Sequence, residues 1–328
     1  MRVIVDAYGG DHAPLEILKG TRLAIDELGV TALLSGNEDK LRALAKAESI
    51  SVDGMDFVNA PLVMPVEAEP TEILKAYSDS SMAVGFQKLA AGEGDAFVTA
   101  GSTGAAIVGG TLIVKRIKGI KRPALGTVIP TTNGRYMLMD IGANAECRPE
   151  MLYQFALMST IYMERIMGVK SPRVGVVNIG TEETKGLELQ IETGKLLRES
   201  PLNFIGNIEA RELPLGGCDV AVTDGFTGNI ILKLTEGMGK MMSSELKGML
   251  FESTKTKIAA LLLKSALGRF KAKLDYTEYG GAPIMGTAMP VIKAHGSSNA
   301  KAFKNAIRQA EIYHRQNVIE EIRSAIAK

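Results

Sequence analysis

The sequence has no tryptophan and only two cysteines and three histidines. Cys147 and Cys218 fall in no paired-cysteine motif, and with so few histidines they form no zinc signature. We therefore expect no metal and no other cofactor. The sparse use of cysteine indicates a reducing cytoplasm.

An excess of charge of either sign is also missing, because 38 Lys and Arg stand against 37 Asp and Glu. No overall field would draw this chain to nucleic acid. No stretch reaches the ~18 apolar residues of a membrane-spanning helix, and the N-terminal residues have no signal-peptide pattern. The sequence predicts a protein that is soluble or lies on a membrane surface.

Four common catalytic motifs are absent as well. There is no G-x-x-x-x-G-K-[ST], no G-x-G-x-x-G between a strand and a helix, no G-x-S-x-G and no H-E-x-x-H. These absences argue against kinase, dehydrogenase, serine-hydrolase and zinc-protease chemistry. They leave no obvious protein nucleophile, which favours a reaction in which a bound phosphate attacks.

Short apolar runs alternate with helical patterns through residue 230. Several runs are apolar on both faces, as expected when helices cover both sides of a parallel sheet. The alternation predicts an α/β fold with a doubly wound, mostly parallel sheet in an α/β/α sandwich, as one domain over residues 1–328. The predicted strands are Val3–Asp6, Thr31–Ser35, Asp56–Asn59, Ala96–Thr99, Tyr136–Ile141, Val174–Asn178, Phe204–Ile205 and Val220–Thr223, and the predicted helices include Leu15–Leu28, Asp39–Ala47, Ser80–Ala91 and Arg148–Met167.

The segment from Asn229 to about 275 is a helix-forming stretch without proline, longer than one side of a sheet needs. It predicts a helical hairpin that projects from the body, with a break near Ser253–Thr256 or at Gly268. A glycine-rich segment, Tyr279–Gly286, and a C-terminal helix from Asn299 onward are expected to follow.

Glycine-rich polar strings follow most of the predicted strands. The carboxyl ends of strands in an open parallel sheet converge on one crevice, and helices that begin there present N–H groups to anions. A single string of this kind is usually only a tight turn, but several at one edge predict a phosphate site. The strings are Asp6–Pro14, Thr99–Ala106, Asp140–Asn144, Asn178–Gly186, Thr223–Asn229 and Gly280–Gly286.

Taken together and in this order, the strings DAxGGDHAP, AGxTGA, DIGAN, NIGTE followed by KG, FIGNIEARE, TDGFTGN, YGGA and VIKAHGSS resemble the acyl-ACP:phosphate acyltransferase family of bacterial glycerolipid synthesis. The match runs from Asp6 to Ser298. Two departures from the family pattern are Tyr8, where Met is usual, and Ser102, where Asn is usual.

The resemblance implies a homodimer of α/β/α subunits with a fold similar to phosphotransacetylases and isocitrate-type dehydrogenases. It implies that a long-chain acyl group passes from acyl carrier protein to inorganic phosphate, giving acyl phosphate for phospholipid synthesis. Peripheral membrane association of a cytoplasmic protein and a downstream glycerol-3-phosphate acyltransferase are implied by the same resemblance.

Such a reaction requires donors that hold phosphate. We expect Gly101, Thr103 and Gly104 to supply them at a helix start, with a simple turn as the alternative. His12 is expected at the phosphate site, unless its neighbour Asp11 only caps a helix. The predicted substrate-binding residues are Gly9, Gly10, His12, Gly101, Ser102, Thr103, Gly104, Asn144, Thr181, Asp224, Gly225 and Gly228.

The predicted catalytic residues are Lys185, Asn229 and His295. Lys185 would neutralise phosphate or the developing oxyanion, unless it is a solvated surface lysine. Asn229 would polarise the thioester carbonyl or simply cap a helix, and Asp224 would orient Lys185 or a water. His295 is the candidate for protonating the leaving thiolate, with a structural histidine as the alternative.

The segment Lys257–Leu274 combines an apolar core with Lys257, Lys264, Arg269, Lys271 and Lys273, and it contains no acidic residue. Basic apolar helices lie in membrane interfaces. Alternatively, the same segment forms a dimer surface or a binding site for an acidic acyl carrier protein. The predicted membrane contacts are Ile258, Leu261, Leu262 and Leu263.

Three other functions stay open at this point. A phosphotransacetylase-like enzyme that uses acyl-CoA would share the glycine-rich loops but would not need a basic apolar projection. A non-catalytic membrane-associated scaffold would bind phosphate or acyl groups without turnover. An isocitrate-type dehydrogenase would bind nicotinamide.

Overall fold

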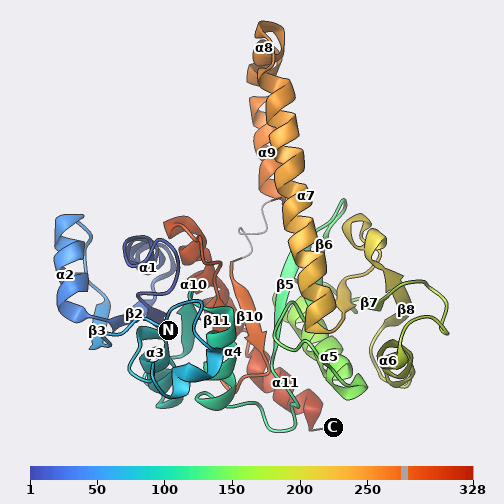
Figure 1. Cartoon of the computed structure of the whole chain (residues 1–328), viewed down its shortest axis with the longest axis horizontal. Helices are drawn as coiled ribbons and strands as arrows, with labels where there is room; N and C mark the ends of the chain where they lie inside the picture. The colour runs from blue at the N-terminus through green and yellow to red at the C-terminus, as the bar shows by residue number, and fades with distance from the viewer. Residues whose placement is uncertain (275–279, 328) are drawn as a thin grey trace.

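The structure is a computed structural model that describes residues 1–274 and 280–327, except for the side chains of Arg269 and residues 271–274. A sheet of 11 strands runs through the body in the order β3-β2-β1-β4-β11-β10-β5-β6-β9-β7-β8 (Figure 1). The strands are β1 (Arg2–Asp6), β2 (Thr31–Gly36), β3 (Met55–Asn59), β4 (Ala96–Thr99), β5 (Ala124–Pro130), β6 (Arg135–Met139), β7 (Val174–Asn178), β8 (Phe204–Glu209), β9 (Val220–Val222), β10 (Ala282–Met285) and β11 (Val291–Lys293).

The middle of the sheet reverses strand direction. Strands β3, β2, β1, β4 and β11 pair in parallel, and so do β6, β9, β7 and β8. Between these two groups, β10 and β5 pair antiparallel to each other and to their outer neighbours. The two parallel groups therefore run in opposite directions, and their carboxyl ends lie at opposite edges of the sheet.

Helices cover both faces of the sheet because alternate side chains of a strand point to opposite sides. In β1, Ile4 faces a core shared with α3 and α4, whereas Val3 and Val5 face a core shared with α1 and α10. In the other half, β6 packs against α5 in the same manner. The helices of the body are α1 (Leu15–Leu28), α2 (Glu38–Ala47), α3 (Ser81–Ala90), α4 (Thr103–Leu112), α5 (Pro149–Arg165), α6 (Glu188–Arg198), α10 (Ala300–Arg315) and α11 (Val318–Ile326), with 3₁₀ helices η1 (Pro70–Leu74) and η2 (Ala210–Leu215).

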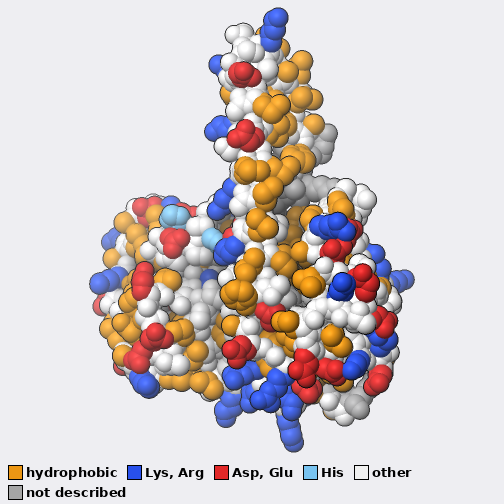
Figure 2. Space-filling model, turned by 45° about the vertical axis from the view of Figure 1, so that its right-hand side comes forward, with side chains coloured by type: hydrophobic (Ala, Val, Ile, Leu, Met, Phe, Trp, Pro, Cys, Tyr) orange, Lys and Arg blue, Asp and Glu red, His pale blue; other side chains and the backbone are white. Residues whose placement is uncertain are grey.

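A helical projection rises from the body, as Figures 1 and 2 show. It consists of α7 (Gly225–Phe251), α8 (Thr254–Leu262) and α9 (Lys264–Leu274). Ser253 begins α8 with a reciprocal capping pair to Thr256, which satisfies the free N–H groups at that break. The base of α7 packs on the body through Ile231 and Leu232, whereas the outer part is exposed.

The α/β/α class, the mostly parallel sheet and the projecting hairpin predicted from the sequence are confirmed. Of the two predicted breaks in the projection, the one at Ser253 is present. The break at Gly268 is wrong, because α9 continues through this residue, and the second break falls at Leu263 instead. The predicted C-terminal helix is two helices, which Asn317 separates in a left-handed conformation with φ 52°. Tyr279 lies outside the described residues.

One part of the sequence argument is wrong. The glycine-rich loops do not share one edge of the sheet, because β10 and β5 reverse the strand direction between the two halves. Loops from both edges still reach one place, since β10 and β11 are short. At ~3.3 Å per residue, a three-residue strand such as β11 spans only about 10 Å.

Candidate active site

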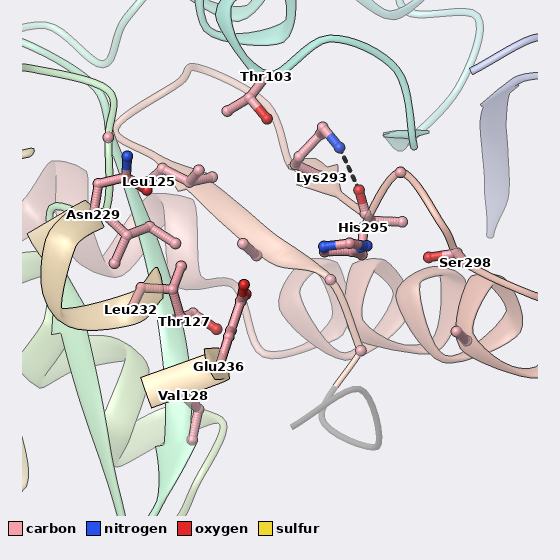
Figure 3. A pocket seen from close by; sticks show the side chains of 18 of the residues that line it. Thr103, Leu125, Thr127, Val128, Asn229, Leu232, Glu236, Lys293, His295 and Ser298 are labelled. Atoms are coloured by element: carbon pink, nitrogen blue, oxygen red, sulfur yellow. Dashed lines mark hydrogen bonds between the residues drawn. The ribbon is translucent and has the colours of Figure 1, made fainter. Parts of the chain in front are cut away.

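A cavity of about 400 Å³ lies at the centre of the sheet, where the two halves meet. Its walls differ in character, as Figure 3 shows. One wall comes from β5 and the first turns of α7 and carries Leu125, Val128 and Leu232. The other wall comes from the segment after β11 and the starts of α4 and α10, and it carries the polar side chains of Thr103, Lys293, His295 and Ser298. The first wall also carries the polar side chains of Thr127, Asn229, Lys233 and Glu236, so it is apolar only in part where it faces the polar groups of the second wall.

Lys293 is the buried cation of the polar wall, with 8% of its surface exposed. It is the last residue of β11, and its Nζ donates to the carbonyl oxygens of Ala100 (3.3 Å) and Ala294. Burial lowers the pKa of Lys293 from 10.5 to about 8, against the opposite effect of Asp6 and Asp11. Because this pKa stays above neutral pH, an ammonium group with few protein partners lines the cavity.

The loops after β1, β4 and β11 hold this lysine in place. The buried carboxylate of Asp6 accepts hydrogen bonds from Ser81 Oγ (2.6 Å) and Thr99 Oγ1 (2.7 Å). Burial raises the pKa of Asp6, and these hydrogen bonds and Lys293 oppose the rise. The loops after β1 and β11 are also tied by main-chain contact, because Asp11 N donates to Gly296 O at 2.8 Å.

His295 extends from the same loop into the cavity. Burial lowers its pKa below 6.5, so the ring is neutral near neutral pH. Its Nδ1 accepts a hydrogen bond from Ser297 N (3.2 Å) and lies 2.8 Å from Ser297 Oγ. An accepting Nδ1 assigns the ring proton to Nε2, which can donate to a group bound in the cavity.

The opposite wall depends on the contact between α7 and the loop after β6. Asp224 caps α7 by accepting from Thr227 N (2.8 Å) and Thr227 Oγ1 (2.9 Å). Gly228 is buried, and a Cβ at this position would overlap the carbonyl oxygen of Asp140. This close approach requires glycine and places Asn229, one residue further along, on the cavity.

Asp140 organises the loop that α7 contacts. Its carboxylate accepts from the N–H groups of Gly142 (3.1 Å), Ala143 (3.0 Å) and Asn144 (2.7 Å), and from Asn144 Nδ2 (2.8 Å). Burial raises the pKa of Asp140, and these hydrogen bonds oppose the rise. Asn144 also donates to Pro123 O at 2.9 Å, so the amide that we predicted to bind substrate holds the loop together.

The structure brings three of the predicted site residues into the cavity wall, namely Thr103, Asn229 and His295. The helix-cap alternatives for Asn229 and for Asp11 are both wrong, because Asp224 caps α7 and no side chain caps α1. Two predicted substrate-binding residues cap helices instead of lining the cavity. Ser102 caps α4, and Asp224 caps α7.

The remaining predicted residues lie around the cavity or away from it. Gly10 has φ +105°, and a Cβ there would press on Gly296 O, so this glycine allows the first loop to meet the polar wall. Lys185 and Thr181 lie exposed in the loop after β7 and do not line the cavity. The others lie outside the set of lining residues: Gly9, His12, Gly101, Gly104, Asn144, Gly225 and Gly228.

The residue that sequence reasoning missed is Lys293. This lysine occurs in the sequence analysis only within the string VIKAHGSS, and the phosphate-neutralising cation was assigned to Lys185. The available signal was a lysine that directly follows the apolar pair Val291–Ile292 in a short run. A charged residue at the end of a buried strand rarely stays buried without a partner or a function.

The fold and the site define a class of protein. The chain is similar in structure to a phosphotransacetylase from Streptococcus pyogenes, with a TM-score of 0.65, 15% identity and coverage of 98% of this chain and 94% of that one. A phosphotransacetylase from Staphylococcus aureus gives a TM-score of 0.62 at 16% identity, with coverage of 95% and 94%. These similarities show the fold, which is that of the phosphotransacetylases.

Sequence comparison narrows the class to a family. The family model described as "Fatty acid synthesis protein" matches residues 1–321. A protein named "Phosphate acyltransferase" from Thermoanaerobacterium thermosaccharolyticum is 45% identical over 326 residues, which cover 99% of this chain and 97% of that protein. One of the same name from Alkaliphilus oremlandii is 45% identical over 327 residues, covering 100% and 98%. The chain belongs to the family of these phosphate acyltransferases, which the fatty acid synthesis protein model describes, and it is an acyltransferase.

Proposed function

We propose that this enzyme transfers a long-chain acyl group from acyl carrier protein to inorganic phosphate, giving an acyl phosphate for phospholipid synthesis. The observation that carries the proposal is the buried ammonium of Lys293, which lines a cavity whose opposite wall presents apolar side chains of β5 and α7 beside the amide of Asn229. An anion and an acyl chain require these two surfaces together. The names of the relatives support phosphate as the acceptor.

Phosphate binds at the polar wall in this proposal. The Lys293 ammonium pairs with its oxygens, and Thr103 and Ser298, at the starts of α4 and α10, supply hydroxyl donors. Charge-assisted hydrogen bonds of this kind are about twice as strong as neutral ones. The N-terminal ends of both helices add partial positive charge. Positive charge from Lys293 and the two helix ends favours the dianion of the bound phosphate, because nearby cations lower the pKa of an acidic group.

The dianion attacks the thioester carbonyl and forms the new C–O bond. The C–S bond then breaks, and its electron pair leaves with the thiolate of the carrier. Asn229, on the wall opposite Lys293, donates its amide hydrogen to the carbonyl oxygen as negative charge develops there. The proton that phosphate loses ends on the thiolate through His295, which gives its Nε2 proton to the sulfur as the ring takes up the proton from phosphate, so the ring is neutral before and after the step.

Lys185 retains a proposed role as a second cation for the substrates, in its exposed loop after β7. Thr181 in the same loop, and Gly9, His12 and Gly104 in the loops near the polar wall, remain proposed substrate contacts. None of them lines the cavity, so these contacts would require substrates that extend beyond it.

The projection supports the proposals of a homodimer and of peripheral membrane contact. Exposed apolar side chains follow one another along α7 at helical spacing, at Ile230, Leu234, Met238 and Met241, and such a stripe suits pairing with a second copy. At the far end, Leu261 and Leu262 are 71% and 81% exposed and are suited to contact lipid. Among the described residues, no helix is long and apolar enough to span a membrane.

The test is acyl-phosphate formation by the wild-type protein from palmitoyl carrier protein and phosphate. The product is trapped as a hydroxamate, and the reaction without phosphate serves as the control. We expect product that depends on both phosphate and enzyme, with a higher kcat/KM for the carrier thioester than for palmitoyl-CoA or acetyl-CoA. Preference for acetyl-CoA would replace the proposal with a phosphotransacetylase-like activity.

A further inference from the structure

The loop between α4 and β5 carries a dense group of cations, Lys115, Arg116, Lys118, Lys121 and Arg122, which we name the 115–122 patch. No acidic residue interrupts it, and all of these side chains are exposed. Among the described residues, none of them takes part in an ion pair. Figure 2 shows basic side chains gathered at the end of the body opposite the projection, where Figure 1 shows this loop.

The patch is held rigidly, although it lies in a loop. Ile117 and Ile120 are 2% and 4% exposed and anchor it in the core. Ile117 N donates to Gly286 O at 2.9 Å. The side chain of Gln154 on α5 accepts from Lys121 N (2.8 Å) and donates to Gly119 O (2.9 Å). Cations presented on a fixed backbone lose little conformational entropy when a partner binds.

The patch is joined through β5 to the cavity wall. The residue that follows it, Pro123, accepts the hydrogen bond of Asn144 from the loop after β6. Strand β5 then runs from the patch into the cavity wall at Leu125 and Thr127. At ~3.3 Å per residue, Arg122 and Thr127 lie roughly 17 Å apart. A partner docked on the patch would therefore need an extended arm to bring a reacting group into the cavity.

The charge distribution favours an acidic protein over a lipid surface. The whole chain has a net charge of only +1, so its attraction for an acidic partner is local to basic clusters such as this patch. The isoleucines of the loop point inward, whereas membrane-surface segments expose apolar side chains beside their cations. One exposed apolar residue, Leu112 at the end of α4, is 56% exposed beside the patch, as expected for a small contact with a charged rim.

We propose that the 115–122 patch is the docking surface for an acidic carrier protein that bears the acyl thioester on an extended arm. This inference rests on the proposed function, and it adds the surface that recognises the donor. Attraction between the patch and the carrier increases the association rate and weakens with salt.

The test reverses the charges whose side chains have no structural role. Arg116 donates to the carbonyl oxygen of Lys121, and Lys115 has a positive φ of 74°, so both are left unchanged. The variant is Lys118→Glu, Lys121→Glu and Arg122→Glu combined. Its activity is measured with palmitoyl carrier protein and with palmitoyl-pantetheine, which has the same reacting thioester without the protein.

The matched control makes the same change in charge away from the patch. Lys40→Glu, Lys46→Glu and Lys170→Glu combined alter lysines that are exposed and, among the described residues, form no ion pair. Wild type, patch variant and control are compared at low and high salt with both donors, and their binding to anionic vesicles is measured by sedimentation.

We expect the patch variant to raise KM for palmitoyl carrier protein by at least tenfold at low salt and to lose most of its salt dependence, with kcat/KM for palmitoyl-pantetheine unchanged. The control should match wild type. An unchanged KM for the carrier overturns the inference, as does an equal loss with both donors. Loss of vesicle binding with normal carrier kinetics overturns it in favour of a lipid surface. If wild type uses palmitoyl-pantetheine but not the carrier, the proposed function itself fails.

Discussion

Substitution of Lys293 by methionine separates catalysis from stability. The lowering of the Lys293 pKa from 10.5 to about 8 corresponds to roughly 3 kcal/mol that favour the neutral amine in the folded protein. Methionine has a similar length and no charge, so Lys293→Met removes this cost. It also removes the hydrogen bonds to the carbonyl oxygens of Ala100 and Ala294, each of which contributes about 1 kcal/mol. The two effects nearly cancel, and we expect stability to stay within about 2 kcal/mol of wild type.

The effect on activity is expected to be much larger. Loss of one preorganised donor to a developing charge costs about 10²–10³-fold in rate, and Lys293 would contact the attacking phosphate. The kcat/KM for phosphate should therefore fall by about that factor in Lys293→Met, measured by acyl-phosphate formation. Thermal unfolding is followed by circular dichroism, because the chain has no tryptophan for intrinsic fluorescence.

Lys185→Met is the matched comparison, since this lysine is exposed and does not line the cavity. We expect a smaller loss for it than for Lys293→Met. The reasoning is refuted if Lys293→Met keeps normal phosphate kinetics, or if Lys185→Met alone loses its response to phosphate. A folded but inactive Lys293→Met protein with an active Lys185→Met protein would support Lys293 as the phosphate-binding cation.

Three other outcomes follow from the structure. Because the ammonium of Lys293 is the binding form, kcat/KM for phosphate should fall as pH rises through about 8; a profile that stays level to higher pH would contradict this. Gly228→Ala should destabilise the protein by at least about 1–3 kcal/mol, because the added Cβ would overlap Asp140 O. The control Gly237→Ala, at a position with open space around it, should not be destabilised. Equal thermal midpoints for the two variants would count against the packing of α7 on Asp140. Leu261→Glu at the exposed tip should weaken sedimentation with vesicles and leave activity in solution intact, and persistent vesicle binding would move the membrane contact elsewhere.

The strands of the two parallel groups, except β11, were predictable from the sequence because they alternate with helical patterns along the chain. Strands β1, β2 and β7 were placed within one residue, since buried parallel strands read as apolar runs. The central strands β10 and β11 were missed, although β4 and β9 are equally short and were found, because β10 contains Pro283 within a glycine-rich run and no helical pattern separates β10 from β11. Strand β5 had an available signal in Asn133-Gly134, which favours a hairpin between two apolar runs.

Individual site residues could be predicted from the sequence, but their arrangement around the cavity could not. Loop position identified Thr103, Asn229 and His295, all of which line the cavity. The arrangement could not follow from the sequence, because the short antiparallel strands set which loops face each other. The choice of Lys185 over Lys293 as the phosphate-binding cation has a similar cause. Whether a lysine is buried depends on tertiary neighbours such as Asp6, which lie far away in the sequence.

The position of β11 has a consequence for how the chain is made. This strand, from the C-terminal part of the chain, lies between β4 and β10, and β10 in turn pairs with β5. Until residues 282–293 emerge from the ribosome, the nascent chain can form only two separate half-sheets, each with an unpaired buried edge. Exposed strand edges of this kind promote aggregation. A ribosome that stalls before this segment therefore releases an aggregation-prone product that lacks Lys293 and His295, so quality control of incomplete chains matters more for this fold than for one assembled from the N-terminus onward.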